Sequence, residues 1–215
     1  MSKVKDIPVG SQGSCAVKKS KRVLVACEYS GVVRDAFRRL GHHAYSCDLL
    51  QSNSAYHHQG DVREVLAGQH WDLMVAHPPC THLAVSGARH FKNKQQEQKE
   101  ALEFVKLLMD ADIPQIAIEN PVSVISTKIR KPDQIVHPYM FGDPVKKKTC
   151  LWLKGLPLLE PTDEVEPETV KLANGDVYSK WDYEISKMPH DQRGHLRSKT
   201  FEGFANAMAE QWGQA

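Results

Sequence analysis

The sequence predicts an α/β protein with a mostly parallel sheet and helices on both faces of that sheet. Short apolar runs of strand length recur along the chain, and they alternate with segments whose apolar residues have helical spacing. The connections between these segments are short, as in the right-handed strand–helix–strand units of parallel sheets. Together these observations favour one sheet that is covered by helices on both sides.

The composition of the 215 residues is that of an ordinary soluble globular protein, with 41% hydrophobic and 25% charged residues. The formal net charge of +2 is too small to indicate nucleic-acid binding by itself. The five cysteines form no CxxC pair and have no zinc-ligand spacing, and there is no signal peptide. No apolar run approaches the roughly 20 residues of a membrane span. We therefore expect a cytoplasmic protein with reduced thiols, no metal site and no membrane contact.

The first strand–helix–strand unit is the clearest part of the pattern. Residues 22–28 form the first expected strand, whose residues 23–27 are apolar and include two β-branched valines, which is typical of a central parallel strand. A helix is expected at 32–40, where the apolar residues share one face, and Gly41 ends it. Residues 44–49 form the second expected strand, so the chain opens with one complete unit of a parallel sheet.

The rest of the chain continues this alternation as far as residue 120 and then becomes less regular. In chain order we expect a partial helix at 60–66, a strand at 72–76, a helix at 95–110, a strand at 114–120, a loop up to 144, a strand at 149–153, a β-hairpin at 170–178 and a closing helix at 201–212. The Asn174-Gly175 pair is the strongest short signal for a hairpin turn. Residues 1–20 are polar and aperiodic. We expect them to be a flexible tail before a single domain at 21–215, with the hairpin as a small insert at about 160–190.

A cysteine follows the strand at 72–76 after a rigid turn. His77-Pro78-Pro79 ends the strand, because a proline cannot donate to a sheet ladder and restricts the residue before it. Cys80 then lies at the carboxyl end of the strand, where ligands and chemistry collect in open α/β sheets. A thiol held there is a candidate nucleophile, and the alternative is a buried, unreactive cysteine.

A carboxylate follows the next strand in the same way. Glu119-Asn120-Pro121 comes at the end of the expected strand at 114–120. If this strand and the strand before Cys80 are parallel neighbours, the thiol and the carboxylate face the same cleft.

The first unit has the features of a nucleotide-like cofactor site. Its turn places backbone N–H groups at the start of a helix, where they are available to a ligand. Asp48 ends the second strand about 20 residues after Glu28, and an acid there can accept hydrogen bonds from both ribose hydroxyls. There is no GxGxxG motif, so a dinucleotide is disfavoured. A plain strand–helix–strand unit with Asp48 as a loop residue remains the alternative.

The order Pro78-Pro79-Cys80 and then Glu119-Asn120 resembles the DNA cytosine-5 methyltransferases. The chain is similar to a short, divergent member of that family, of the kind common in phages and prophages. The resemblance covers residues 23–157 and, more weakly, 197–212. Amino-methyltransferases typically carry an aromatic residue after Pro-Pro, so Cys80 favours carbon as the methyl acceptor.

This resemblance implies a Rossmann-like fold and methyl transfer from S-adenosylmethionine to C5 of cytosine in DNA. Cys80 would form a covalent adduct with the base, Glu119 would protonate or hydrogen-bond ring N3, and Asn120 would hold the loop. For the cofactor, the resemblance implies Asp48 at the ribose, Asp61 at the adenine amino group, Pro78 nearby, and Cys27, Glu28, Tyr29, Ser30 and Gly31 at the methionine part. For the substrate, it implies Pro79, Lys146, Lys147 and Lys148 near the target base and phosphate.

The chain departs from the family pattern in four places. The turn at 27–31 replaces the usual glycine-rich motif, and Pro121 replaces a small apolar residue. His77 stands where a small residue is usual, and we expect it to be a loop histidine bonded to backbone. The chain between 149 and 197 is too short for the family's target-recognition domain.

The missing recognition domain leaves several functions open, because sequence specificity needs side chains that reach base edges. The protein could read DNA with the hairpin and the loop at 81–91, rely on a protein partner, be weakly specific, or modify cytosine in RNA or a free nucleotide. The altered turn also leaves open a catalytically silent, methyltransferase-like module that binds or regulates a partner.

Overall fold

The computed structural model describes residues 19–215, except for the side chains at 87, 89, 90, 92, 190, 191 and 195. The tail expected at residues 1–20 therefore lies almost entirely outside the described residues. Within the described part, no helix is long and apolar enough to cross a membrane.

A seven-stranded sheet forms the centre of the molecule, in the order β3-β2-β1-β4-β5-β7-β6. Its strands are β1 Arg22–Ala26, β2 His43–Asp48, β3 His57–Gln59, β4 Leu73–Ala76, β5 Gln115–Pro121, β6 Gln134–Val136 and β7 Thr149–Lys154. β7 is antiparallel to both of its neighbours, and every other pair is parallel. The predicted α/β class with a mostly parallel sheet is confirmed.

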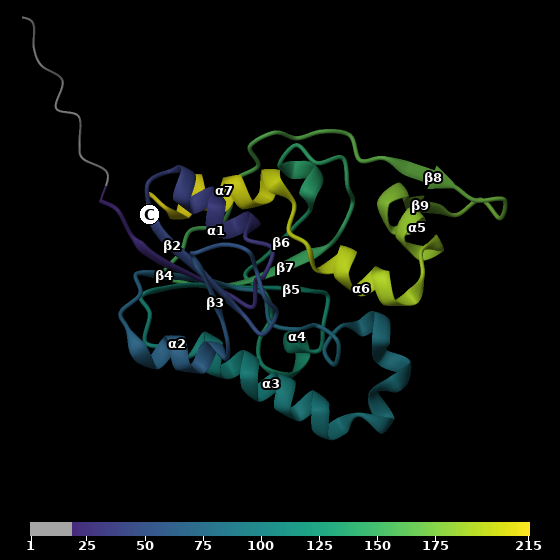
Figure 1. The fold of residues 1–215 in the computed structure, drawn as a ribbon. Coiled ribbons are helices and arrows are strands. Elements are labelled where there is room, and N and C mark those ends of the chain that lie inside the picture. The colour runs from purple at the N-terminus through teal and green to yellow at the C-terminus, as the bar shows by residue number, and fades with distance from the viewer. Residues whose placement is uncertain (1–18) are drawn as a thin grey trace, which may run out of the picture.

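Helices cover both faces of this sheet. Figure 1 shows α1 (Val32–Arg39) and α7 (Glu202–Trp212) together on one face, and α2 (Val62–Gly68), α3 (Gln95–Met109) and α4 (Ile125–Lys128) on the other. The chain winds from β1 through α1 to β2 in one direction and later returns to β4 on the other side of β1. The carboxyl ends of β1 and β4 therefore flank a topological switch point, where ligands bind in folds of this class.

The two apolar cores explain why the strands read as continuous apolar runs. In β1, Val23 and Val25 belong to the core under α1 and α7, whereas Leu24 and Ala26 belong to the core under α2 and α3. All four side chains are fully buried. Because both faces are covered, successive residues are all apolar. Burial of each larger side chain stabilises the fold by about 1.5–3 kcal/mol.

The elements that were not expected from the sequence are short or polar. They are β3, β6, α4, the 3-10 segments Val85–Asn93 and Pro138–Met140, and the helices α5 Lys180–Lys187 and α6 His190–Ser198. The expected hairpin is present as β8 Thr169–Lys171 and β9 Val177–Ser179, with the turn at Asn174-Gly175. The strands β3 and β6 have three residues each, and they exist because a longer neighbour pairs with them.

Candidate active site

Cys80 lies on a fixed turn just beyond β4. Its carbonyl oxygen accepts hydrogen bonds from the backbone N–H of Leu83 (3.0 Å) and of Ala84 (2.9 Å). Cys80 is exposed, whereas Cys47 and Cys150 are buried. This exposure favours the nucleophile over the alternative of a buried, unreactive cysteine.

Asn120 fastens the Pro-Pro turn to the neighbouring strand. Its side-chain Nδ2 donates a buried hydrogen bond to the carbonyl oxygen of Pro78, at 2.8 Å. Pro78 itself is buried, and Pro79 is exposed beside Cys80. The position of Cys80 is therefore set from β5 as well as from β4.

The segment after Cys80 is also tied to the segment after Asn120. Ala84 and Ser123 form an antiparallel bridge, and the N–H of Val85 donates to the carbonyl oxygen of Val122 at 3.1 Å. Leu83, just before these contacts, is fully buried. The first part of the expected polar loop at 81–91 is therefore held in place, and most of the remainder forms the 3-10 segment.

His77 and Glu119 form an ion pair at the adjacent ends of β4 and β5. The pairing of Ala76 with Ile118 puts the next residue of each strand side by side. His77 Nδ1 lies 3.0 Å from Glu119 Oε2, and the two side chains are only 10% and 17% exposed. The backbone N–H of His77 does bond to the carbonyl oxygen of Ala26, at 2.9 Å. Its ring, however, also contacts Glu119. We had expected only the bond to the backbone.

The charges around Cys80 favour the neutral thiol. Partial burial of the sulfur and the charge of Glu119 raise the pKa of Cys80, while Lys147 and Arg197 act in the opposite direction. Burial would raise the pKa of Glu119, but the hydrogen bond and charge of His77, with the charge of Lys147, lower it. Burial would lower the pKa of His77, but its bond to Glu119 and the charges of Glu119 and Glu28 raise it overall.

Lys147 is the member of the predicted lysine run whose charge acts on this site. Lys146 and Lys148 are exposed and instead lower the pKa of His137, after the larger effect of its burial. Lys147 Nζ donates to the carbonyl oxygen of Arg197 at 3.0 Å. Lys147 is half-buried between two exposed lysines, so the three consecutive lysines have different surroundings.

Arg197 was not among the predicted site residues. Its charge opposes the rise in the pKa of Cys80, and its backbone is bonded to Lys147. The same lysine lies 5.4 Å from the ring centroid of Trp181 and 5.7 Å from that of Phe201. The weaker resemblance at 197–212 was the one sequence signal that could have indicated Arg197.

The turn after β1 is shaped by its own side chains. Glu28 is 5% exposed, and its carboxylate accepts hydrogen bonds from the backbone N–H of Val33 (2.8 Å) and of Arg34 (3.3 Å). Ser30 Oγ also donates to it, at 3.3 Å. The N–H groups that we expected to be available to a ligand at the start of α1 are therefore partly used by Glu28. Tyr29 lies in the same turn, half-buried.

Gly31 closes this turn in a left-handed conformation, with φ at 79°. A Cβ atom at this position would lie 2.1 Å from a guanidinium nitrogen of the buried Arg34. Arg34 donates to Ser46 Oγ on β2 at 2.9 Å. Only glycine fits here without displacing Arg34. The shape of the turn therefore depends on the close approach of the Gly31 backbone to the Arg34 side chain.

Two carboxylates converge on the end of β1 from neighbouring elements. Burial and then the charges of Asp48, Cys47 and Asp61 raise the pKa of Cys27 to about 12. Asp48 Oδ1 accepts from the N–H of Leu50 at 2.8 Å. Asp61 caps α2 through Arg63, whose backbone N–H and Nη1 donate to its two carboxylate oxygens, each at 2.9 Å. Asp48 is the better placed of the two acids to accept bonds from a ligand.

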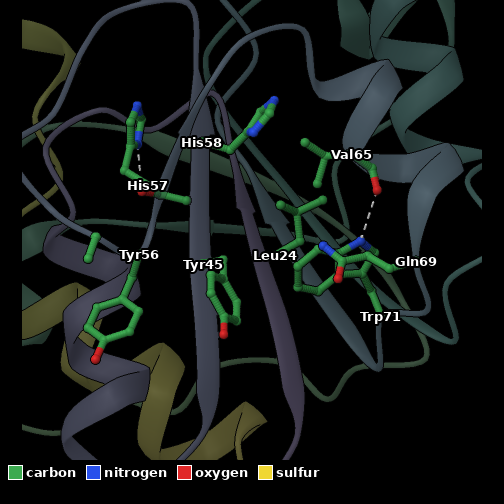
Figure 2. A pocket seen from close by; sticks show the side chains of 10 residues that line it. Leu24, Tyr45, Tyr56, His57, His58, Val65, Gln69 and Trp71 are labelled. Carbon is green, nitrogen blue, oxygen red and sulfur yellow. Dashed lines mark hydrogen bonds between the residues drawn. The ribbon is translucent and has the colours of Figure 1, made fainter.

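A separate cavity of about 190 Å³ lies between β2, β3 and α2 (Figure 2). Its walls include the aromatic rings of Tyr45, Tyr56 and Trp71, and Trp71 Nε1 donates to the carbonyl oxygen of Val65 at 3.4 Å. None of its lining residues belongs to the set predicted from the sequence. Among the described residues, no group of three or more His, Cys, Asp or Glu side chains could hold a metal ion.

Among known proteins, we find similarity to this chain only in solved structures. No protein-family model matches the chain, and no curated protein matches it. One similar structure is described as a prophage-encoded DNA modification methyltransferase from E. coli, with 14% identity, a TM-score of 0.46, and coverage of 68% of this chain and 52% of that chain. Another is a methyltransferase from Entamoeba histolytica, with 15% identity, a TM-score of 0.43, and coverage of 68% and 58%.

The chain thus spans between about half and three fifths of the length of these two proteins. At this degree of similarity, the function has to be argued from the site itself.

Proposed function

We propose that this protein transfers a methyl group from S-adenosylmethionine to C5 of cytosine in DNA, through a covalent adduct of Cys80. One observation carries the proposal: the exposed thiol and the Glu119–His77 pair occupy adjacent strand ends, beside the switch point of the sheet. The order of Pro78-Pro79-Cys80 and Glu119-Asn120 supports it, as in the cytosine-5 methyltransferases that the motif resembles.

The chemistry of cytosine requires a nucleophile that reaches C6 and an acid that reaches N3. The Cys80 thiol loses its proton to solvent, and the thiolate adds to C6, which moves the electron pair of the C5–C6 double bond onto the ring. N3 takes up a proton as this charge develops, and Glu119 lies on the strand that would face it. Lys147 and Arg197 favour the thiolate, because nearby cations lower the pKa of a thiol.

The cofactor supplies an electrophilic methyl group on a sulfonium. After C5 has taken that methyl group, a base, here water, removes the C5 proton, the S–C6 bond breaks, and N3 returns its proton. Cys80 leaves as thiolate and takes a proton from solvent, so the protein is unchanged after each turnover. The rigid turn at Pro78-Pro79, bonded to Asn120, orients the thiol during both steps.

For the cofactor, we propose Asp48 at the ribose hydroxyls and Asp61 near the adenine amino group. The proximity of both acids to Cys27, at the end of β1, supports this assignment. The turn from Cys27 to Gly31 would approach the methionine part. Glu28 is occupied with α1, so we propose that it shapes this turn rather than receiving the cofactor directly.

For the substrate, we propose DNA held by cations at the mouth of the site, among them Lys147 and Arg197, whose charges act on Cys80. The small unit formed by β8, β9, α5 and α6 offers little surface for reading base edges. We therefore propose weak intrinsic specificity or a protein partner that supplies recognition. RNA and free nucleotides share the reacting ring and are tested beside DNA.

A silent binding module is the second candidate. The protonated state of Cys80 and the use of the α1 N–H groups by Glu28 favour it, because each of them lowers the reactivity or the cofactor affinity expected of an enzyme. Such a module would bind nucleic acid or S-adenosylmethionine without transferring the methyl group.

Tritium transfer from labelled S-adenosylmethionine to DNA, RNA and cytidine nucleotides tests the proposal. We expect transfer to DNA, none with Cys80→Ser, and a covalent complex with DNA that contains 5-fluorocytosine. Lys99→Ala is the control, because this exposed lysine lies on α3, is paired with Glu103 and belongs to no part of the proposed site. Undiminished transfer by Cys80→Ser would reject the covalent mechanism. Calorimetric binding of S-adenosylmethionine without transfer to any substrate would favour the silent module.

A further inference from the structure

His77 is held by one contact to β1 and one contact to β5 at the carboxyl edge of the sheet. Its backbone N–H is bonded to Ala26 of β1, and its Nδ1 is 3.0 Å from Glu119 Oε2 of β5. An ionised carboxylate can only accept hydrogen bonds, so Nδ1 is the donor. Nε2 is buried and, among the described residues, has no hydrogen-bond partner. The ring is therefore oriented by Glu119 alone.

The charged groups that face this ring come from three different elements. Glu119 lies on β5, Glu28 in the turn after β1, and Lys147 in the segment before β7. The two carboxylates favour the imidazolium, and Lys147 and burial oppose it. The pKa of His77 is raised overall, because Glu119 is in direct contact and the lysine is not.

Glu119 alone cannot supply the proton that N3 needs. Its pKa is lowered, so at neutral pH it is a carboxylate that already accepts a hydrogen bond. When the S–C6 bond forms, the ring charge has to be neutralised by a proton from elsewhere. The nearest acidic proton is the one on His77 Nδ1, in direct contact with the Glu119 carboxylate.

We infer that His77 is a positioning residue that holds Glu119 in place and stores the proton which Glu119 delivers to N3 of the target cytosine. This inference rests on the proposed function. The proton passes from Nδ1 to the Glu119 carboxylate and from the resulting carboxylic acid to N3, which leaves a neutral imidazole and a carboxylate. When the C5 proton is lost and the S–C6 bond breaks, the N3 proton returns by the same route.

The pair itself is tested without any substrate, by NMR titration of the histidine side chains. The His77 resonances are assigned as those that disappear in His77→Asn. We expect His77 to titrate above the ordinary histidine range in the wild type and to titrate lower in Glu119→Gln, where the neutral amide no longer favours the imidazolium. An ordinary titration in both proteins would overturn the inference.

The role of the pair in transfer is tested with His77→Asn and His77→Ala. The asparagine keeps an N–H donor near Glu119 but has no proton to release, so we expect kcat to fall about 10²-fold with KM little changed. We expect the wild type to lose activity as the pH rises through the raised pKa of His77, and we expect this loss to be absent from the pH profile of His77→Asn. The alanine variant loses the donor as well and should be worse, with a raised KM.

Controls separate this inference from the proposed function. His43→Asn replaces an exposed histidine on β2 and should keep the wild-type rate and pH profile. Full activity of His77→Asn with an unchanged profile would overturn the inference and leave the proposed function standing. A raised His77 titration together with no transfer by the wild type on any substrate would reject the proposed function and the proton delivery, while the ion pair itself would stand.

Discussion

Cys80 is a neutral thiol whose ionisation is set by two cations and one carboxylate. Burial of the sulfur and Glu119 raise its pKa, and Lys147 and Arg197 partly offset that rise. We expect such a thiol to react slowly with oxidants and alkylating agents, because the thiolate is the reactive form and the raised pKa lowers its fraction.

Removal of Lys147 should make this thiol less reactive still. We expect Lys147→Ala to slow the alkylation of Cys80 by iodoacetamide at pH 8 by a factor of about 2 to 10, because the thiolate fraction falls when the cation is lost. The rate is measured by mass spectrometry of the Cys80 peptide. Lys146→Ala is the matched control and should match the wild type. Equal rates in all three proteins would show that Lys147 does not act on the thiol.

The ion pair between His77 and Glu119 predicts a stability that depends on pH. The raised pKa of His77 gives stabilisation that is complete below its unfolded value of about 6.5 and is lost as pH rises through the higher folded value. The lowered pKa of Glu119 gives stabilisation that is complete above about 4.3 and is lost as pH falls through the lower folded value. Between these limits both contributions are present.

We therefore expect Glu119→Gln to reduce the free energy of unfolding most at pH 5.5, by about 3–5 kcal/mol, because it leaves a buried imidazolium without its partner. The loss should shrink as pH rises, since a neutral imidazole can bond to the amide. Urea unfolding at several pH values measures this. The control is Glu184→Gln, whose partner Lys187 is about half exposed, and it should cost less than about 1 kcal/mol. A loss that is constant with pH would contradict the assigned charge states.

At the scale of elements, the turn between β1 and α1 depends on Gly31. An alanine there would have to adopt a positive φ and displace the guanidinium of the buried Arg34, which bonds to β2. Gly41 also has a positive φ, of 88°, but an added Cβ would have no atom within 4 Å. The two glycines therefore separate backbone strain from displacement of the arginine.

We expect Gly41→Ala to cost about 1–2 kcal/mol of stability and to leave the cofactor affinity unchanged. Gly31→Ala should cost more than that and should weaken S-adenosylmethionine binding at least tenfold, because β1, α1 and β2 meet at this turn. Urea unfolding and calorimetric titration measure the two effects. Equal behaviour of the two variants would mean that Arg34 can move without consequence.

The predictability of the elements follows from where each one obtains its stability. β1, β4, β5 and β7 are apolar because both of their faces are covered, so their own sequence is enough to identify them. β3 and β6 could not be predicted, because their three residues form strands through a neighbour. His77 and Glu119 are 42 positions apart in the chain, and their contact depends on the register in which β4 pairs with β5. Local sequence patterns do not determine this register.

At the scale of the whole molecule, the fold places the candidate site residues at one edge of the sheet, and the net charge of the chain is near zero. The total of +2 cannot attract DNA over a distance, so the DNA binding that we propose would depend on a few cations near the site. Lys147 and Arg197 are the cations whose charges act on Cys80. The unit of α5, α6 and the hairpin, linked to them through the contact of Lys147 with Trp181, adds little surface.

Because phosphate contacts release counterions, this arrangement predicts how binding responds to salt. Each phosphate contact contributes about −0.9 to the slope of log K against log salt concentration for duplex DNA. We expect Arg197→Ala to reduce the magnitude of the slope by about 1 and to weaken binding equally on duplexes of different sequence, since a phosphate contact carries no base information. Fluorescence anisotropy over a salt series measures both effects. The matched control is Lys187→Ala on α5, whose Nζ is paired with Glu184 at 3.3 Å. An unchanged slope for Arg197→Ala would place the DNA elsewhere, and a loss confined to one sequence would make Arg197 a reader of bases, which the small size of this unit argues against.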